Sequence, residues 1–180
     1  SYTIQTRTWT WTSGLQGWLE TPRAMFIGFG PENFQIPFVR HFNPNHFRGP
    51  GSETLFDRAH NMFIEVLVTT GIIGFIIYIA MFSAIVQQMV NFLKEKFNDR
   101  KNSKIGFDDP YAVWPLIIIA IIVTYCIHNF FIFDTTANYL AIFTAIGFAS
   151  FISLTKDDKD NNKKPLVPDY VAFGVSLALA

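Results

Sequence analysis

The chain has 180 residues, of which half are apolar and 17% are aromatic, and its formal net charge is zero. A neutral chain offers no electrostatic basis for binding nucleic acid, so nucleic acid is excluded as a partner. The single Cys126 excludes an internal disulfide framework. Because the sequence starts without Met and stops inside an apolar run, we expect a C-terminal fragment of a larger polytopic membrane protein.

Residues 1–61 contain no apolar run long enough to cross a bilayer, and we predict a large, partly helical external loop. Near its start, threonines alternate with Ile4, Trp9 and Trp11. This pattern is typical of a short strand, or of an interfacial segment with its Trp side chains at headgroup level.

The rest of this loop shows one helical segment and two turn or loop segments. Apolar residues between Leu15 and Phe26 favour a short amphipathic helix, interrupted at Pro22. Residues 28–31, Gly-Phe-Gly-Pro, indicate a tight turn. The Pro-rich residues 34–51 predict an irregular loop.

Beyond residue 61, apolar segments alternate with charged connectors. We predict transmembrane helices at residues 62–92, 112–131 and 139–154, and the start of another at 167–180. The segments between them are connectors at 93–111 and 155–166 and a short link at 132–138. The predicted fold class is an all-α polytopic membrane protein.

The distribution of Lys sets the topology. Every Lys lies in the two connectors 93–111 and 155–166, which therefore face the cytoplasm by the positive-inside rule. Residues 1–61 and the link 132–138 then lie outside. The predicted external loop carries Arg as its only cation type: Arg7, Arg23, Arg40, Arg48 and Arg58.

An external loop with only Arg suggests recognition of phosphate. A guanidinium group binds phosphate or pyrophosphate oxygens through two parallel hydrogen bonds, which a Lys ammonium cannot do. The alternative is that these side chains lie along the membrane interface or pair with nearby carboxylates. The candidate partners are Glu20, Glu32, Glu53 and Asp57.

His60 is the candidate general base. If the following helix begins near Met62, Asn61 is its N-cap, and the positive helix end disfavours an imidazolium. If the helix begins near Ser52, Asp57 lies one turn before His60 and can orient its ring. Asp57, Asn61 and Glu65 would then lie on one face of that helix. The alternative to catalysis is a histidine that caps a membrane helix.

Three other patterns in the sequence give weaker evidence for a functional site than His60 and the arginines do. His41 and His46 lack a Cys or carboxylate at ligand spacing, so no metal site is predicted. The Gly-x-Gly-Pro segment is a turn rather than a phosphate cradle, because it lacks the Lys and the strand–turn–helix context. His128 and Asn129 are interpreted as possible cavity lining, with Asp134 close by in the sequence.

Three motifs, in this order, resemble one family. An Arg stands four residues before a Trp (Arg7, Trp11), and a Pro precedes Gly-x-Gly-Pro-x-x-Phe (Pro22, then residues 28–34). A His-Asn pair then leads into an apolar helix with a Glu and a Gly-x-x-Gly pair (His60, Asn61, Glu65, Gly71 and Gly74). Together they resemble the O-antigen ligase and O-antigen polymerase superfamily of bacterial envelope glycosyltransferases.

The resemblance implies a GT-C-like helical bundle in the bacterial cytoplasmic (inner) membrane. It implies metal-independent transfer of a glycan from an undecaprenyl-pyrophosphate carrier to an acceptor hydroxyl, without a cofactor. Arg7 corresponds to an Arg that binds the pyrophosphate and His60 to the histidine that activates the acceptor. Arg58 is either a second phosphate ligand or a local partner of Asp57. The residues expected to support the site are Asp57, Asn61, Glu65, Trp11, Gly28 and Gly30.

The motifs do not identify the acceptor. A ligase that glycosylates a lipid, a polymerase that extends a glycan and a protein O-oligosaccharyltransferase share them. Outside the family, the alternatives are a transporter subunit, expected to show an internal repeat and helices broken at the midplane, or a membrane anchor. No role is assigned to Arg23, Arg40 or Arg48.

Overall fold

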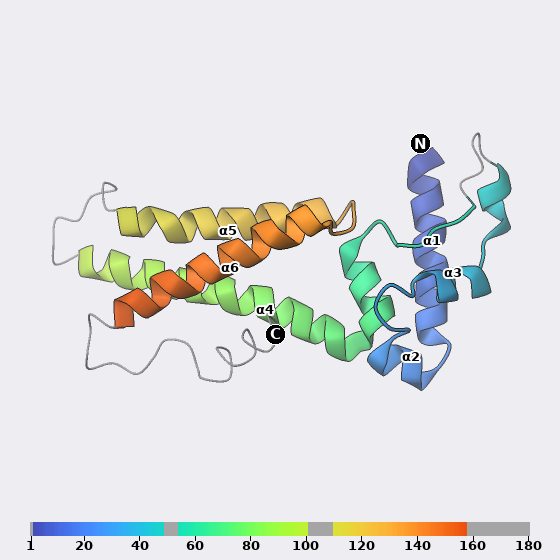
Figure 1. Cartoon of the computed structure of the whole chain (residues 1–180), viewed down its shortest axis with the longest axis horizontal. Helices are drawn as coiled ribbons and strands as arrows, with labels where there is room; N and C mark the ends of the chain where they lie inside the picture. The colour runs from blue at the N-terminus through green and yellow to red at the C-terminus, as the bar shows by residue number, and fades with distance from the viewer. Residues whose placement is uncertain (1, 49–53, 101–109, 158–180) are drawn as a thin grey trace. The chain divides into compact units, whose positions relative to one another are not determined.

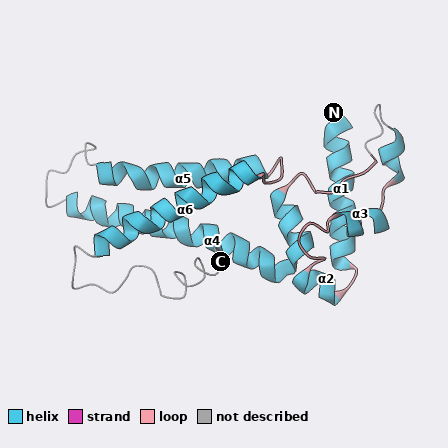
Figure 2. Cartoon of the chain, viewed as in Figure 1, coloured by secondary structure: helices cyan, strands magenta, loops and turns pink. Residues whose placement is uncertain are grey.

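The computed structural model describes residues 2–48, 54–100 and 110–157, and all regular structure in these ranges is helical (Figures 1 and 2). The all-α prediction is therefore confirmed for the part of the chain described. The helices are α1 (Tyr2–Leu19), α2 (Pro22–Ile27), α3 (Gln35–Arg40), the 3-10 helix η1 (Pro44–Arg48), α4 (Met62–Arg100), α5 (Pro110–Asn129) and α6 (Thr136–Asp157). The predicted span 167–180 and most of connector 155–166 lie outside the described residues.

Among the described residues, two helical segments are long and apolar enough to cross a membrane, Met62–Glu95 and Thr136–Ser153. They coincide with the predicted spans 62–92 and 139–154. The predicted span 112–131 corresponds to a shorter apolar helix, Val113–Asn129.

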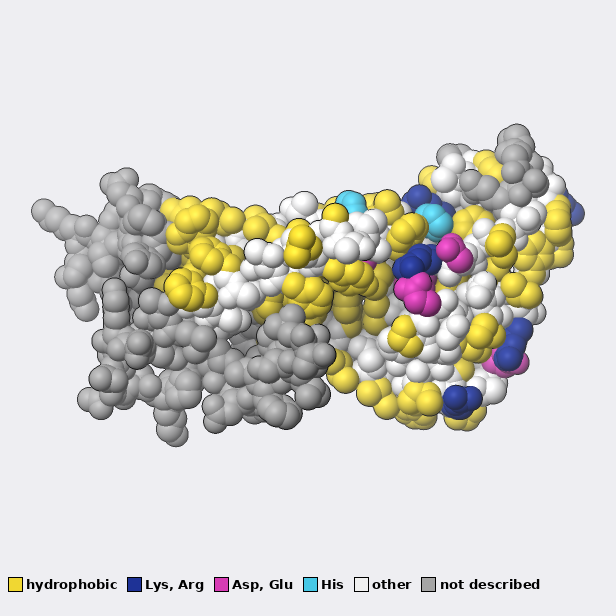
Figure 3. Space-filling model, in the orientation of Figure 1, with side chains coloured by type: hydrophobic (Ala, Val, Ile, Leu, Met, Phe, Trp, Pro, Cys, Tyr) yellow, Lys and Arg dark blue, Asp and Glu magenta, His cyan; other side chains and the backbone are white. Residues whose placement is uncertain are grey.

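The chain divides into two compact units. Unit 1 consists of residues 1–81 and 124–136, and unit 2 of residues 82–123 and 137–180. Unit 2 buries aliphatic and aromatic side chains from all three of its helices, and the rings of Trp114 and Phe148 pack edge to face between α5 and α6. On the face drawn in Figure 3, the coloured charged side chains lie over unit 1.

The first helix, α1, shows that the strand alternative for the N-terminal threonines is wrong. Thr6, Thr10, Gly14 and Gly17 are buried on one stripe at helical spacing. The glycine at position 17 of this stripe leaves room for α3, because a Cβ added at Gly17 would come within 2.2 Å of a Pro37 side-chain atom. The threonine hydroxyls are satisfied within the helix, since they donate to backbone carbonyls three or four residues earlier, as Thr10 does to Thr6 at 2.9 Å.

Two other local predictions need correction. The segment from Leu15 to Phe26 forms parts of two helices, since α1 ends at Leu19 and α2 begins at Pro22 with Thr21 as its side-chain cap. The region predicted as irregular loop contains α3 and η1. Phe38 of α3 belongs to the core of unit 1, which consists of Phe34, Phe38, Phe56, Ala59 and Val68.

The start of α4 decides between the two alternatives for His60. The helix begins at Met62, and the Asn61 side chain accepts hydrogen bonds from the backbone of Phe63 and Ile64 at 3.0 and 3.1 Å. Asn61 is thus the N-cap, as predicted. The alternative start near Ser52 is wrong, because residues 54–61 are not helical.

Helix α4 is interrupted at Gly71, where φ is 68° and ψ is −175°. In a continuous helix the carbonyls of Val68 and Thr69 would accept from residues four positions later. Here they accept from the loop after α2: Phe29 N–H donates to Val68 at 3.1 Å, and Gly30 N–H to Thr69 at 2.7 Å. The turn of residues 28–31 therefore fits into the break of α4.

Replacing Gly71 with alanine is expected to lower the stability of unit 1 by about 2–4 kcal/mol, as a decrease in the melting temperature of the detergent-solubilised protein. An added Cβ would lie 2.3 Å from the Phe26 carbonyl carbon, and the positive φ adds strain. Gly147→Ala is the control, because a Cβ there meets nothing within 4 Å. Equal melting temperatures for the two variants would contradict the close contact.

Candidate functional site

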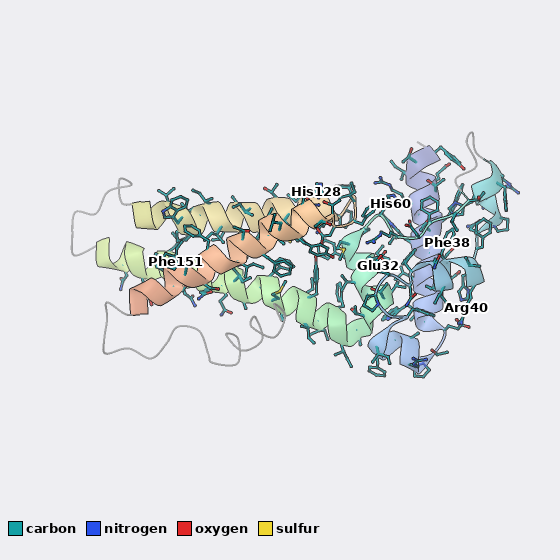
Figure 4. The ribbon with its side chains drawn as sticks, in the orientation of Figure 1. Glu32, Phe38, Arg40, His60, His128 and Phe151 are labelled. Carbon is teal, nitrogen blue, oxygen red and sulfur yellow. The ribbon has the colours of Figure 1, made fainter. Side chains whose placement is uncertain are left out.

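His60 lies where the loop of residues 54–61 meets the link between α5 and α6. Its ring packs edge to face against Phe56 and Phe133, with centroids 5.7 and 5.2 Å away. Its backbone is in the left-handed region, with φ at 53°. Figure 4 shows His60 on a loop of unit 1, close to the start of α4. His60 is half-buried.

The geometry assigns the two ring nitrogens different roles. His60 Nδ1 lies 3.3 Å from the Arg58 carbonyl oxygen. A carbonyl oxygen only accepts, so this contact is a hydrogen bond when Nδ1 carries the proton. Nε2 then has a lone pair, as a general base requires. Asp57 was expected to orient this ring only if the helix began early, and its side chain is exposed instead.

The peptide unit of Ala59, just before His60, is held on both sides. The buried Glu65 carboxylate accepts from the Ala59 N–H at 2.7 Å. Trp11 Nε1 of α1 donates to the Ala59 carbonyl at 2.6 Å. Two residues expected to support the site, Glu65 and Trp11, thus fix the backbone that carries His60.

This contact predicts a difference between two Glu65 variants. Glu65→Leu leaves the buried Ala59 N–H without an acceptor, a loss of about 1–3 kcal/mol. We expect a lower melting temperature and reduced transfer activity, because the His60 turn loses its support. Glu65→Gln retains an acceptor oxygen and should keep most of the stability and most of the transfer activity. Equal loss in the two variants would show that the negative charge, rather than the hydrogen bond, is what the fold needs.

Arg58 is engaged by two neighbours in unit 1. It forms an ion pair with Glu32, and its guanidinium carbon lies 5.3 Å from the centre of the Phe133 ring. The expected local partner, Asp57, is therefore replaced by Glu32, a carboxylate from a distant loop. The Arg58 side chain is 28% exposed and that of Glu32 71%.

Arg7 reaches the same link from α1. Its Nη1 donates to the Phe131 carbonyl oxygen at 2.9 Å. A guanidinium has five N–H donors, so this bond leaves Arg7 able to bind further acceptors. Arg7 is far from Arg58 and His60 in the sequence, yet all three side chains contact residues 131–133 of one short segment.

An apolar surface groove of about 320 Å³ adjoins this segment. It is lined by Phe63, Cys126, Ile127, Phe130 and Phe131. Phe131 also supplies the carbonyl that accepts from Arg7, and the Phe130 ring packs against that of Trp11. A cationic side chain thus stands at the edge of a hydrophobic surface.

A buried polar network holds the other side of the link. Asn129 Nδ2 donates to Asp134 Oδ1 at 3.0 Å, and the Tyr125 hydroxyl donates to the other oxygen of the same carboxylate. Asn129 and Asp134 are buried, whereas His128 is exposed. Asn129, which was predicted as cavity lining, therefore helps to fix the bend from α5 to α6 through its bond to Asp134.

Two predicted supporting residues, Gly28 and Gly30, and the three arginines without an assigned role make other contacts or are exposed. The turn of Gly28 and Gly30 binds the backbone of α4, as described above, which leaves no phosphate cradle there. Arg40 pairs with Glu20, while Arg23 and Arg48 are exposed. Within the described ranges, no three His, Cys, Asp or Glu side chains gather as a metal-binding group.

Sequence reasoning missed the roles of Phe131 and Phe133. The signal available was a link without Lys or Arg between two apolar segments, which predicts an external turn but not its contacts. Comparisons with protein-family models, curated proteins and solved structures found no match.

Proposed function

We propose that the chain is part of a metal-independent envelope glycosyltransferase. It transfers a glycan from an undecaprenyl-pyrophosphate carrier to an acceptor hydroxyl, as the resemblance to O-antigen ligases implies. The observation that carries the proposal is the convergence of His60, Arg7 and Arg58 on the link segment beside an apolar groove. This arrangement suits a substrate with an anionic pyrophosphate and a lipid tail.

In this mechanism, His60 Nε2 takes the proton of the acceptor hydroxyl while that oxygen attacks the anomeric carbon of the glycan. The bond between the anomeric carbon and the pyrophosphate oxygen breaks, and its electron pair leaves with the pyrophosphate. The Arg7 guanidinium stabilises the charge that develops on this leaving group. Proton transfer of this kind contributes about 10²–10⁴-fold to a rate.

Arg58 is the proposed second pyrophosphate ligand. It must exchange Glu32 for the substrate, and this exchange is inexpensive because an ion pair with so exposed a carboxylate contributes about 0–1 kcal/mol. Glu32 then keeps the guanidinium oriented while the site is empty.

The acceptor is a lipid, a growing glycan or a protein. The proposal therefore includes an O-antigen or polysaccharide polymerase and a protein O-oligosaccharyltransferase as alternatives to a ligase. The enzyme is placed in the bacterial cytoplasmic membrane as a multi-pass protein with residues 1–61 on the outer face. The two apolar helical segments Met62–Glu95 and Thr136–Ser153 support membrane association.

The test is a transfer assay in membranes that contain the whole protein, with a labelled polyprenyl-pyrophosphate glycan as donor and EDTA present. Lipid A-core, repeat-unit glycan and protein acceptors are supplied separately. We expect a glycosylated product with one of them and little product from the matching monophosphate-linked donor. Transfer only after a divalent cation is added would show that the enzyme needs a metal. No transfer to any acceptor would favour a transporter subunit or a membrane anchor.

A further inference from the structure

Helix α2 has an apolar surface that the rest of unit 1 leaves uncovered. Phe26 and Ile27 are 56% and 53% exposed, and Leu19 at the end of α1 is 58% exposed. The exposed Arg23 lies on the same short helix. Figure 1 places α2 at the lower edge of this unit, where Figure 3 shows hydrophobic side chains around a basic one. We call residues 19–27 the α2 edge.

The backbone ties the α2 edge to a candidate membrane helix. Phe29 and Gly30, directly after α2, donate to the carbonyls of Val68 and Thr69 in α4. The Phe26 carbonyl is so close to Gly71 that a Cβ there would clash with it. These contacts fix α2 at the level of Gly71, inside the segment Met62–Glu95 that is apolar enough to cross a membrane.

The apolar surface continues along α4 after Gly71. Ile73, Ile76 and Ile77 are 50%, 59% and 65% exposed, as expected of side chains that face lipid. Because α2 abuts the start of this stretch, Phe26 and Ile27 extend the same hydrophobic surface beyond the helix itself. Burial of apolar area contributes about 25 cal/mol per Å², so this surface favours a hydrophobic surrounding.

We propose that the α2 edge inserts into the outer leaflet of the bilayer. Phe26 and Ile27 lie among the acyl chains, and Arg23 extends to the lipid phosphates with its aliphatic part along the apolar surface. The inference rests on the part of the proposed function that puts α4 in a membrane. It gives Arg23 a lipid contact. It also means that the outer loop is attached to the membrane surface through the α2 edge.

The chain offers a matched control on the same unit. Val39 of α3 is 60% exposed, slightly more than Phe26, but within the described residues no backbone hydrogen bond joins α3 to α4. If exposure of an apolar side chain alone decided lipid contact, the two positions would behave alike. The proposal requires them to differ.

The experiment places a nitroxide label at one position at a time, in whole protein reconstituted into phosphatidylethanolamine and phosphatidylglycerol vesicles. The variants are Phe26→Cys, Val39→Cys and Ile76→Cys, each in a background in which the native cysteines of the whole protein, Cys126 among them, are replaced by alanine. Power saturation is measured with oxygen, which partitions into lipid, and with a water-soluble nickel chelate. We expect oxygen to relax the labels at 26 and 76, with loss of the nickel effect, and nickel to relax the label at 39.

Each other outcome overturns the proposal in a distinguishable way. Nickel access at 26 with oxygen access at 76 would leave α4 in the membrane and put α2 in water. Protection of 26 from both reagents would show that another protein segment or a second copy covers it. Lipid-like behaviour at 39 would mean that the contact is not specific to α2. Nickel access at 76 would remove the membrane placement of α4 and with it the proposed function.

Discussion

Replacing His60 with alanine is expected to lower the rate of glycan transfer by about 10²–10⁴-fold, with donor binding largely retained. The reason is that in the proposed mechanism His60 takes the acceptor proton, and its Nδ1 lies beside the Arg58 carbonyl on a half-buried residue. The measurement is the initial rate in membranes at saturating donor. Expression level and melting temperature are recorded for each variant.

Two further variants separate catalysis from folding. His60→Asn keeps the left-handed turn, because Asn tolerates positive φ better than most residues, but it supplies no base. It should fold like the wild type and lose the same activity as the alanine variant. His41→Ala is the matched histidine control, since His41 contacts Glu20 rather than the link, and it should keep full activity. Unchanged transfer in His60→Ala would remove His60 as the base.

Replacing Arg7 with alanine is expected to lower transfer by about 10²–10³-fold, because the charge on the leaving pyrophosphate loses its stabilising donor. Arg7→Lys is the more informative variant. Lysine can still donate to the Phe131 carbonyl and preserve the tie between α1 and the link, but it cannot form two parallel bonds to a pyrophosphate. Losing one charge-assisted bond of about 1.5–3 kcal/mol predicts a rate decrease of roughly 10- to 150-fold.

The comparison of melting temperature with rate distinguishes a structural role from direct binding. A structural Arg7 would lose stability in the alanine variant and recover both stability and activity as lysine. A pyrophosphate ligand would recover stability but not activity. Arg40→Ala is the control for loss of an exposed Arg in the same unit, since Arg40 pairs with Glu20, and it should transfer at the wild-type rate.

The start of α4 was predictable from sequence because it depends on local chemistry. Asn61 before an apolar run is a capping signal, and the cap requires only neighbouring residues. The fold of residues 2–19 was not predictable in the same way. Their threonines fit two periods, and what selects the helix is the close packing of Gly14 and Gly17 against the distant Phe34 and Pro37.

The candidate site was predictable in its chemistry but not in its assembly. The residue types at positions 7 and 60 indicate an anion ligand and a base. Their meeting point depends on the carbonyl of Phe131 and the ring of Phe133. Every residue has a backbone carbonyl, so the sequence does not indicate which carbonyl accepts from Arg7. A Phe in an apolar segment likewise has many possible roles. The partner of Arg58, Glu32, could equally not be singled out from several available carboxylates.

The interruption of α4 at Gly71 has a consequence for biogenesis. A backbone carbonyl that enters hydrocarbon without a partner costs several kcal/mol, so the broken helix is unfavourable in a bilayer unless residues 29 and 30 are already beside it. Those residues are synthesised first. In the proposed membrane topology they would have to be translocated before α4 leaves the insertion machinery, so the proposal implies an order of assembly in which the loop after α2 is in place before α4 completes its insertion.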